Sequence, residues 1–453
     1  MFRRVLVANR GEVAVRVIRA LHESDVEAVA VYSTADPDAL HVRLADRAVC
    51  IGPPPAPESY LRIPSLVAAA TTTGCDAVHP GWGFLAESPA FVDACADNDL
   101  VFVGPSAETM ARMGDKVQAR TEMRAAGVPI VPGTDEAVGI DEARDAAEEV
   151  GYPVLVKAAA GGGGKGMRLV QGPDELDAAY STAALEAEAA FGDGSLYLEK
   201  AISPARHVEI QVLADGRGGV LTLGERECSI QRRHQKLIEE SPSPALTPET
   251  REEMEGAAER ACTAIDYRNA GTFEFLLGTD GAFYFIELNA RLQVEHPVSE
   301  LVTGIDIVRE QLRIASGEAL ARTGRAERRG HALEVRLNAE DPTREFAPSP
   351  GRVGRFRPPL GPGIRLDTWI EEGTEIPAHY DSLLGKLIVW DETRPDAIAR
   401  ALRGLGELQL DGVATTRELS IDILRSEEFG SGRYSTGFLA EAGARLSALA
   451  AQS

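Results

Sequence analysis

The sequence predicts a multidomain protein of the α/β and α+β classes, in which residues 1–114 form an N-terminal doubly wound α/β domain. The chain opens with an apolar strand, an apolar-spaced helix and a second apolar strand, which is the β-α-β order of a parallel sheet. Short apolar strands then continue to alternate with helical segments. The expected elements are the strands 5–8, 28–32, 77–78 and 101–103 and the helices 13–21, 63–73 and 89–97.

Length and composition narrow the possible functions. The 453 residues allow roughly three domains. The net charge of −23 argues against nucleic acid or an anionic membrane as the main partner, and no apolar run reaches the length of a membrane span. Five widely spaced cysteines without a C-x-x-C pair fit a reduced compartment, so we expect a cytoplasmic protein.

The first turn of the N-terminal domain does not carry a dinucleotide motif. A G-x-G-x-x-G loop is required there and only Gly11 is present, so NAD is not expected. Another helix is expected over 107–126, after the last strand of this domain. It carries Lys116, which composition alone would assign to a solvated helix face.

A glycine-rich turn lies between two predicted strands of the central region. Four successive glycines start at Gly161, and Lys157 and Lys165 flank them. Glycines let a ligand approach the backbone, and amides with flanking lysines would wrap phosphate oxygens. The turn is not a Walker A loop, because Ala159 and Gly166 occupy positions that need Gly and Ser or Thr. A flexible hairpin without a ligand is the alternative.

A dense group of hydrogen-bond donors follows two predicted strands, 196–202 and 207–213. The segment 226–236 contains three Arg, one Lys and one His in a chain of strongly negative charge. RNA binding is one interpretation, but the segment lacks interleaved aromatic residues. An anionic small substrate suits it better.

A predicted hairpin places two acids together. Aromatic-rich runs flank Asp280-Gly281, a dipeptide that favours a type I′ turn. If these two residues form the whole loop, Thr279 pairs with Ala282 and Glu274 lies directly opposite Glu287. Like charges in opposing positions destabilise a sheet. We therefore expect a divalent cation, since Mg²⁺ is usually held by one or two carboxylates plus substrate phosphates.

Polar residues recur at every second position beyond this hairpin. They are Asn289, Arg291, Gln293 and Glu295, with Leu288, Ala290, Leu292 and Val294 between them. A period of two aims one set of side chains to a single side of a strand. An ordinary solvated strand face is the alternative, but so many hydrogen-bonding side chains beside an aromatic run favour a binding site.

A third region begins at 331. Arg336 lies on an alternating apolar strand, where an unpaired guanidinium would be costly, so we expect it to meet an anion. The remaining elements expected downstream of the donor cluster are the helices 251–265, 305–316, 395–408 and 416–426 and the strands 352–357 and 385–390.

Together these motifs resemble the biotin carboxylase family, the ATP-grasp component of acyl-CoA carboxylases, over essentially the whole chain. The matching stretches are 8–12, 79–81, 113–116, 161–167, 225–236, 287–297, 336–342 and 380–382. The resemblance implies a central ATP-grasp domain over 115–330, with a mobile lid at about 133–203, and a C-terminal biotin carboxylase domain over 331–447.

The resemblance also implies roles for individual residues. The expected ATP contacts are Lys116, Lys157, Gly162, Gly163, Gly164, Lys165, Gly166, Met167, Glu199, Lys200, Ile202, His207, Gln231, His234 and Leu276. The expected ligands of Mg²⁺ or Mn²⁺ are Glu274, Glu287 and Asn289. The expected bicarbonate pocket is Arg291, Gln293, Val294 and Glu295. Among the catalytic residues, Glu295 would be the base, Lys236 and Arg291 positive groups, and Arg336 the partner of the biotin ureido oxygen.

The activity implied is ATP- and bicarbonate-dependent carboxylation of carrier-linked biotin through carboxyphosphate, the first half-reaction of an acyl-CoA carboxylase. A biotin carrier protein and a carboxyltransferase subunit would be partners, because the chain lacks the Ala/Val-Met-Lys-Met biotinylation signature. A homodimer is expected through Arg19, Glu23 and Arg365, although Pro362 lies in a turn, 360–363, that lacks the aromatic dimer contact of the family.

Several alternatives remain at this point. The chain would serve equally as the biotin carboxylase component of a pyruvate carboxylase or another biotin-dependent carboxylase. Another ATP-grasp ligase is a second interpretation, although the run 291–295 matches the bicarbonate pocket. A catalytically silent nucleotide-binding scaffold is a third, and ATP turnover that depends on bicarbonate would exclude it.

Overall fold

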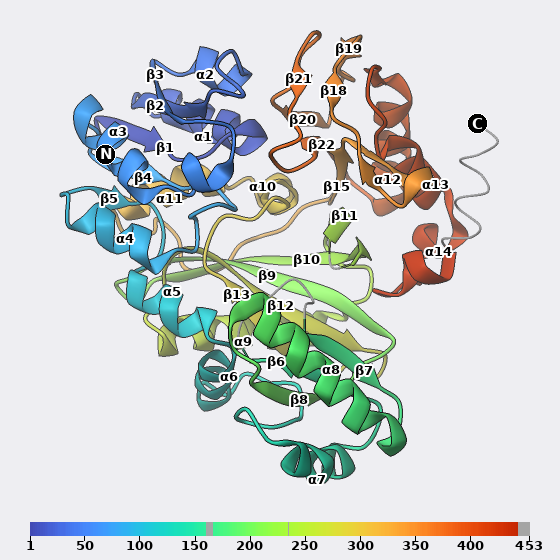
Figure 1. Cartoon of the computed structure of the whole chain (residues 1–453). Coiled ribbons are helices and arrows are strands. Elements are labelled where there is room, and N and C mark those ends of the chain that lie inside the picture. Colours follow the sequence, from blue (N-terminus) through green and yellow to red (C-terminus); the bar gives the residue numbers. More distant parts are fainter. Residues whose placement is uncertain (160–165, 234, 443–453) are drawn as a thin grey trace.

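The computed structural model describes residues 1–159, 166–233 and 235–442. In Figure 1 the N-terminal part (blue) and the C-terminal part (orange to red) lie above a large sheet (green to yellow), and a smaller group of helices and strands lies below it. Within the described ranges, no helix combines the length and apolar character needed to cross a membrane.

The N-terminal part is the predicted doubly wound domain. Its parallel sheet has the strand order β3-β2-β1-β4-β5, so the order reverses between β1 and β4, where such sheets place ligands. All four residues of β1 are buried between covering helices. The strands are β1 Arg4–Val7, β2 Glu27–Ser33, β3 Arg47–Gly52, β4 Ala77–His79 and β5 Val101–Phe102; the helices are α1 Gly11–His22, α2 Leu40–Leu44, η1 Ala56–Glu58, α3 Ile63–Thr73, α4 Pro89–Ala96 and α5 Ala107–Gly114.

The single helix predicted over 107–126 is wrong, because the chain breaks at Asp115. This residue is extended, with φ −82° and ψ 113°, and its carboxylate accepts a hydrogen bond from the backbone N–H of Gln118 at 2.9 Å. An Asp in this position caps a new helix, and α6 (Lys116–Ala125) begins at the next residue. The break places Lys116 in the first turn of α6.

The small layer at the bottom of Figure 1 corresponds to the predicted lid. Its three-stranded antiparallel sheet has the order β7-β6-β8, and two helices pack on it. The elements are α7 Ile140–Val150, β6 Val154–Ala158, β7 Met167–Val170, α8 Pro173–Phe191 and β8 Leu196–Lys200. The predicted glycine turn joins β6 to β7, and residues 160–165 of it lie outside the described residues.

One sheet, antiparallel except for β14, runs through both the central and the C-terminal parts. Its order is β13-β12-β9-β10-β11-β15-β22-β20, with β14 beside β10. Because β11 pairs with β15, the sheet continues across the boundary predicted at 330 and 331. The central elements are β9 Ala205–Asp215, β10 Val220–Arg232, β11 Gln235–Ser241, α9 Pro248–Ala264, β12 Arg268–Gly278, β13 Phe283–Asn289, α10 His296–Thr303, α11 Ile307–Ala315 and β14 Gly324–Arg325.

The C-terminal part adds strands to this sheet and covers them with helices. α12 and α13 pack on β15 and β22 through a separate apolar core. Its elements are β15 His331–Asn338, β16 Glu340–Asp341, η2 Pro342–Arg344, β17 Ala347–Pro348, β18 Gly351–Arg352, β19 Phe356–Arg357, β20 Ile364–Thr368, β21 Glu375–Ile376, β22 Leu383–Asp391, α12 Arg394–Glu407, β23 Gln409–Leu410, α13 Arg417–Arg425 and α14 Glu427–Gly430.

The predicted hairpin forms, but with a different loop. Glu274 does lie opposite Glu287, whereas the predicted pair of Thr279 and Ala282 is wrong, because Gly278 N–H donates to the Ala282 carbonyl at 2.8 Å. The loop is therefore three residues long, with Gly281 at φ +84°, as a three-residue hairpin requires. A β-bulge after Glu274 restores the register that a two-residue loop would have given.

Glu240 of β11 ties the C-terminal part to the sheet. Its carboxylate accepts hydrogen bonds from His331 at 2.7 Å, from Arg394 at 2.6 Å and from the hydroxyl of Tyr434. Burial alone would raise the pKa of Glu240, but the hydrogen bonds from His331 and Arg394 lower it to about 2. The ionised carboxylate therefore stabilises the fold at neutral pH.

We expect Glu240→Gln to lower the free energy of unfolding at pH 7 by about 2–3 kcal/mol. A depressed pKa gives stability that is present above the ordinary value of 4.5 and is lost as the pH falls toward 2. The difference in melting temperature between the two proteins should therefore narrow below pH 4.5. Thermal unfolding followed by circular dichroism at several pH values measures this, and a difference independent of pH would contradict it.

Candidate active site

Four charged side chains form a row across neighbouring strands of the large sheet. Arg226 of β10 lies opposite Glu209 of β9, and Glu209 lies opposite Glu274 of β12. Glu274 in turn lies opposite Glu287 of β13. Directly opposed residues project from the same face of a sheet, so the row is one surface. Glu287 is its exposed end and Arg226 is fully buried.

One ammonium group bridges three carboxylates, two of which belong to this row. The Nζ atom of Lys236 donates to Glu209 at 2.5 Å, to Glu274 at 2.9 Å and to Glu295 at 2.5 Å. Burial alone would lower the pKa of Lys236, but the three carboxylates raise it well above its usual value. Arg226 supplies a second cation and donates to Glu209 at 2.5 Å. The row is therefore a compensated cluster of buried charges.

The alternating segment after the hairpin is a strand only as far as Asn289. A loop follows, and α10 begins at His296, because Pro297 suits the first turn of a helix and cannot donate to a strand ladder. The polar side chains nevertheless converge. Asn289 Nδ2 and Gln293 Nε2 donate to Glu274 Oε1 at 2.9 and 2.8 Å. The loop, and not a continued alternation, brings them together.

Glu295 lies between two cations just before α10. Its Oε1 accepts from Lys236, and its Oε2 accepts from Arg336 Nη2 at 2.8 Å. Burial alone would raise the pKa of Glu295, but Lys236, Arg336 and Arg226 hold it well below its usual range. The positive end of the α10 dipole acts in the same direction. Glu295 is therefore ionised at neutral pH, as a proton acceptor must be.

Arg336 contacts a second acid on its other side. Its Nε donates to Glu239 at 2.6 Å, so the expected anions are two carboxylates of the chain itself. Glu239 lies opposite Glu334, and both are fully buried. Neither oxygen of Glu334 has a hydrogen-bond partner among the described residues, and burial raises its pKa well above its usual value. The buried site therefore disfavours the charged form of Glu334.

Arg291 is held by a residue far away in the sequence. Its Nε donates to Glu87 at 2.9 Å, and its Nη2 donates to Asn289 Oδ1 at 2.7 Å. Glu87 also accepts from the backbone N–H of Ala290 at 3.0 Å. The loop before α4 therefore fixes both the backbone and the guanidinium of the predicted bicarbonate segment.

The predicted ATP residues on the lid are engaged in contacts within the lid. Lys157 of β6 donates to Glu199 of β8 at 2.6 Å. Lys116 lies in the first turn of α6, where burial lowers its pKa and the positive charge of Lys157 lowers it further. Lys200 instead donates to the carbonyls of Gly151 and Tyr152 at 2.8 and 2.9 Å, and its ammonium is engaged by the lid backbone.

His207 connects the predicted nucleotide residues to the acidic row. Its Nε2 lies 2.9 Å from Glu274 Oε2, and its Nδ1 lies 3.5 Å from Gln231 Nε2. Leu276 lies opposite His207 in the strand register. Gly166 and Met167 lie at the start of β7, and Ile202 follows β8. The remaining predictions, Gly162, Gly163, Gly164, Lys165 and His234, lie outside the described residues.

The donor set fits a hard divalent cation. Glu274 and Glu287 offer carboxylate oxygens from opposed positions, and such oxygens are the ligands that Mg²⁺ prefers. Glu287 is exposed as a residue, yet the protein packed around its carboxyl partly desolvates it and raises its pKa, and the neighbouring charge of Glu274 raises it further. A cation between the two would relieve this repulsion. Asn289 turns its nitrogen toward Glu274, while its oxygen accepts from Arg291.

Several residues of this site were not predicted from the sequence. They are Glu87, Glu209 and Glu239, together with Arg120, which donates to Glu199, and Gln211, which accepts from Arg226 at 2.6 Å. One signal was available: His207, Glu209 and Gln211 are polar residues at every second position of a predicted strand whose other members are apolar. No local pattern marks Glu87, which lies 204 positions before Arg291.

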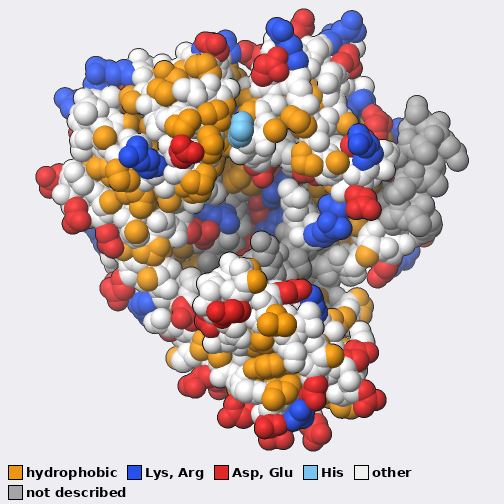
Figure 2. Space-filling model, viewed as in Figure 1, with side chains coloured by type: hydrophobic (Ala, Val, Ile, Leu, Met, Phe, Trp, Pro, Cys, Tyr) orange, Lys and Arg blue, Asp and Glu red, His pale blue; other side chains and the backbone are white. Residues whose placement is uncertain are grey.

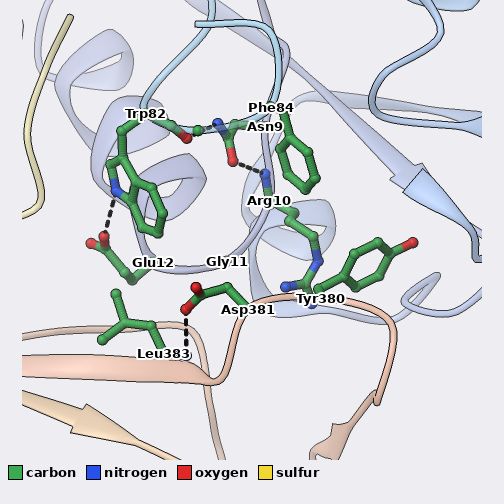
Figure 3. Close-up of a pocket in the computed structure, with 10 residues that line it drawn as sticks. Asn9, Arg10, Gly11, Glu12, Trp82, Phe84, Tyr380, Asp381 and Leu383 are labelled. Carbon is green, nitrogen blue, oxygen red and sulfur yellow. Dashed lines mark hydrogen bonds between the residues drawn. The ribbon is translucent and has the colours of Figure 1, made fainter. Parts of the chain in front are cut away.

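A cavity of about 210 Å³ lies where the N-terminal sheet reverses its strand order. Figure 3 shows Trp82 and Glu12 on one wall and Arg10 beside Tyr380 on another. Trp82 Nε1 donates to Glu12 Oε1 at 2.9 Å.

Figure 2 shows a hollow between the upper parts of the molecule and the lid, with Lys or Arg side chains visible inside it.

Three family models match the chain in succession. They are "Biotin carboxylase, N-terminal domain" over residues 1–110, "Carbamoyl-phosphate synthase L chain, ATP binding domain" over 115–323, and "Biotin carboxylase C-terminal domain" over 334–441. One curated relative is a biotin carboxylase of Nostoc sp., which is 51% identical over 97% of this chain and 99% of that protein. Another is a pyruvate carboxylase subunit of Methanothermobacter thermautotrophicus, which is 49% identical over 97% of this chain and 90% of that protein.

Solved structures show the same architecture. A Campylobacter jejuni biotin carboxylase in a nucleotide complex has a TM-score of 0.94 and 46% identity, over 97% of this chain and 99% of that one. A second structure is the biotin carboxylase domain dimer of Hydrogenobacter thermophilus 2-oxoglutarate carboxylase, in complex with MgADP, ADP and bicarbonate. It has a TM-score of 0.94 and 45% identity, and the match covers 98% of this chain and 99% of that one.

Proposed function

Since the chain belongs to the biotin carboxylase family, we propose that the buried charge cluster of the large sheet carboxylates biotin with ATP and bicarbonate. The observation that carries this proposal is Glu295, an ionised and almost fully buried carboxylate that two cations hold at the edge of an acidic row. Carboxylation of free biotin by the full chain with ATP and labelled bicarbonate is the test. Labelled carboxybiotin and equimolar ADP are expected, and ATP hydrolysis without label transfer would overturn the proposal.

The proposed steps follow from the groups around Glu295. Bicarbonate is a poor nucleophile until it loses a proton, and Glu295 accepts that proton. The dianion attacks the γ-phosphorus of ATP, the bond to the bridging oxygen of ADP breaks, and carboxyphosphate forms. Lys236 and Arg291 neutralise the charge that develops, which is the main contribution a protein makes to phosphoryl transfer.

The second half of the reaction needs a cation beside biotin. Carboxyphosphate releases carbon dioxide and phosphate, the phosphate takes the N1′ proton of biotin, and the nitrogen attacks carbon dioxide. Arg336 stabilises the enolate oxygen of biotin that forms on the way. Its guanidinium is already fixed by Glu239 and Glu295, so it is oriented before the substrate arrives.

Glu274, Glu287 and Asn289 are the residues that would hold Mg²⁺ or Mn²⁺, which would neutralise phosphate oxygens. We expect Glu287→Gln to raise the Mg²⁺ concentration that gives half-maximal ADP formation by about tenfold or more, because a neutral amide is a weaker ligand than a carboxylate. Mg²⁺ titrations at saturating ATP measure this.

Glu253→Gln is the matched control for this experiment. Glu253 is exposed on α9, outside the row, and its loss removes the same charge from the protein. Its Mg²⁺ dependence should equal that of the unmodified chain. Equal shifts in the two variants would show that net charge, and not metal ligation, sets the Mg²⁺ requirement.

The domain limits that we propose are 1–114, 115–330 with a lid at 133–203, and 331–447. The gaps between the matched family regions, at 111–114 and 324–333, support the two internal boundaries. Residues 443–447 lie outside the described part of the chain.

We also propose the partners that this reaction requires. They are a second copy of this chain, a biotin carboxyl carrier protein and a carboxyltransferase subunit, in the cytoplasm. The dimer would use the C-terminal end of α1, where Arg19 and the capping residue Glu23 are exposed. Arg365 instead donates within the chain to Glu300 and Asp367, both at 2.7 Å. The relatives include both biotin carboxylases and a component of a pyruvate carboxylase, so several final acceptors of the carboxyl group fit this chain.

A further inference from the structure

A lysine with no place in the proposed chemistry lies buried next to the active site. Lys386 of β22 is fully inaccessible to solvent. In the strand register it lies opposite Arg336 on one side and opposite Asp367 on the other. A second cation beside Arg336 is unfavourable, and apolar side chains of similar volume often replace buried charges without loss of stability. Glu12 and Asp367 compensate the charge of Lys386, but this compensation does not by itself require a lysine at this position.

The contacts of Lys386 point to the catalytic loop. Its Nζ donates to the backbone carbonyl of Val294, which belongs to the peptide that joins Val294 to Glu295. A carbonyl held by a charged donor fixes the orientation of its peptide plane. Because Glu295 is the next residue and directly precedes α10, this contact sets where its carboxylate enters the site.

The N-terminal domain holds this lysine from the other side. Glu12 Oε2 lies 3.5 Å from Lys386 Nζ, and both side chains are almost completely buried. Glu12 Oε1 accepts from the indole of Trp82 in the cavity wall of Figure 3. The chain of contacts Trp82, Glu12, Lys386 and Val294 thus joins the N-terminal and C-terminal parts at the loop that carries Glu295.

We propose that Lys386, backed by Glu12, is a positioning residue that fixes the Val294–Glu295 peptide and thereby places the Glu295 carboxylate against bicarbonate. This inference rests on the proposed function. Lys386 does not touch the reacting atoms, so its loss displaces the base without removing it. Displacements of about 1 Å in such geometry cost on the order of 100-fold in rate.

The test compares Lys386→Met with the unmodified full chain in assays of bicarbonate-dependent ADP formation. We expect kcat to fall by about 10- to 100-fold and KM for bicarbonate to rise, while KM for ATP stays unchanged. Loss of a purely structural lysine would instead reduce the active fraction and leave both KM values as they are. Unchanged kinetics, or equal rises of both KM values, would overturn the proposal.

A second variant keeps the test valid if Lys386→Met does not fold. Glu12→Gln retains the bond to Trp82 and removes the charge that backs Lys386, so a smaller rise of the same bicarbonate KM is expected, and no rise would overturn the proposal. Leu405→Ala, in the core of α12, controls for general destabilisation and should leave both KM values unchanged. If the unmodified chain itself shows no bicarbonate-dependent ADP formation, the proposed function fails, which is a distinguishable result.

Discussion

Glu295→Gln is expected to lower the rate of bicarbonate-dependent ADP formation by about 10²–10⁴-fold, the usual contribution of a placed general base. The amide keeps the shape of the carboxylate, but its one oxygen can accept from only one of Lys236 and Arg336, and it cannot take up a proton. Nucleotide binding, measured by equilibrium dialysis with ATP, should remain largely intact because Lys157, Glu199 and His207 are untouched. Steady-state ADP release with and without bicarbonate measures the first effect.

Glu334→Gln provides the matched control within the same cluster. Both variants exchange a buried glutamate for its amide, and the two positions are joined through Arg336 and Glu239. Burial disfavours the charged form of Glu334, and neither of its oxygens has a hydrogen-bond partner among the described residues, so its amide removes no hydrogen bond. Its activity should stay near that of the unmodified chain. Equal losses in the two variants would show that Glu295 supports the cluster and does not act as the base.

Local sequence patterns predicted most of the helices and strands and the hairpin that carries Glu274 and Glu287. The β-α-β opening and the Asp280-Gly281 turn were enough to place the first domain and the pair of Glu274 and Glu287. The latter prediction succeeded although its loop was wrong, because the bulge after Glu274 offsets the extra loop residue. A bulge leaves no clear mark in the sequence, so the correct pairing rested on two compensating features.

Contacts between residues far apart in the sequence could not be predicted from local patterns. The acidic row depends on the register between β9 and β12, and the cation that neutralises it comes from β11. The guanidinium of Arg291 depends on Glu87, in a different domain. Such contacts are set by how whole elements pack, and each residue type alone is equally consistent with a solvated surface.

Lys236→Met is expected to have the largest effect on stability. It leaves Glu209, Glu274 and Glu295 buried without their shared cation, and breaking a buried ion pair typically costs about 3–5 kcal/mol. Activity should fall at the same time, because the group proposed to face the transferring phosphate is lost. Thermal unfolding of the full chain at pH 5.5 and pH 8 measures the first effect.

The sign of the pH dependence separates this explanation from simple loss of packing. Without the ammonium group, burial and mutual repulsion raise the pKa values of these carboxyls above their unfolded value, so the folded variant binds more protons than the unfolded one. Its stability must then fall as the pH rises, and its deficit should be larger at pH 8 than at pH 5.5. Lys200→Met loses only bonds to the carbonyls of Gly151 and Tyr152, so its smaller deficit should be the same at both pH values. A Lys236→Met deficit that is equally independent of pH would show that the three acids are not held by this lysine.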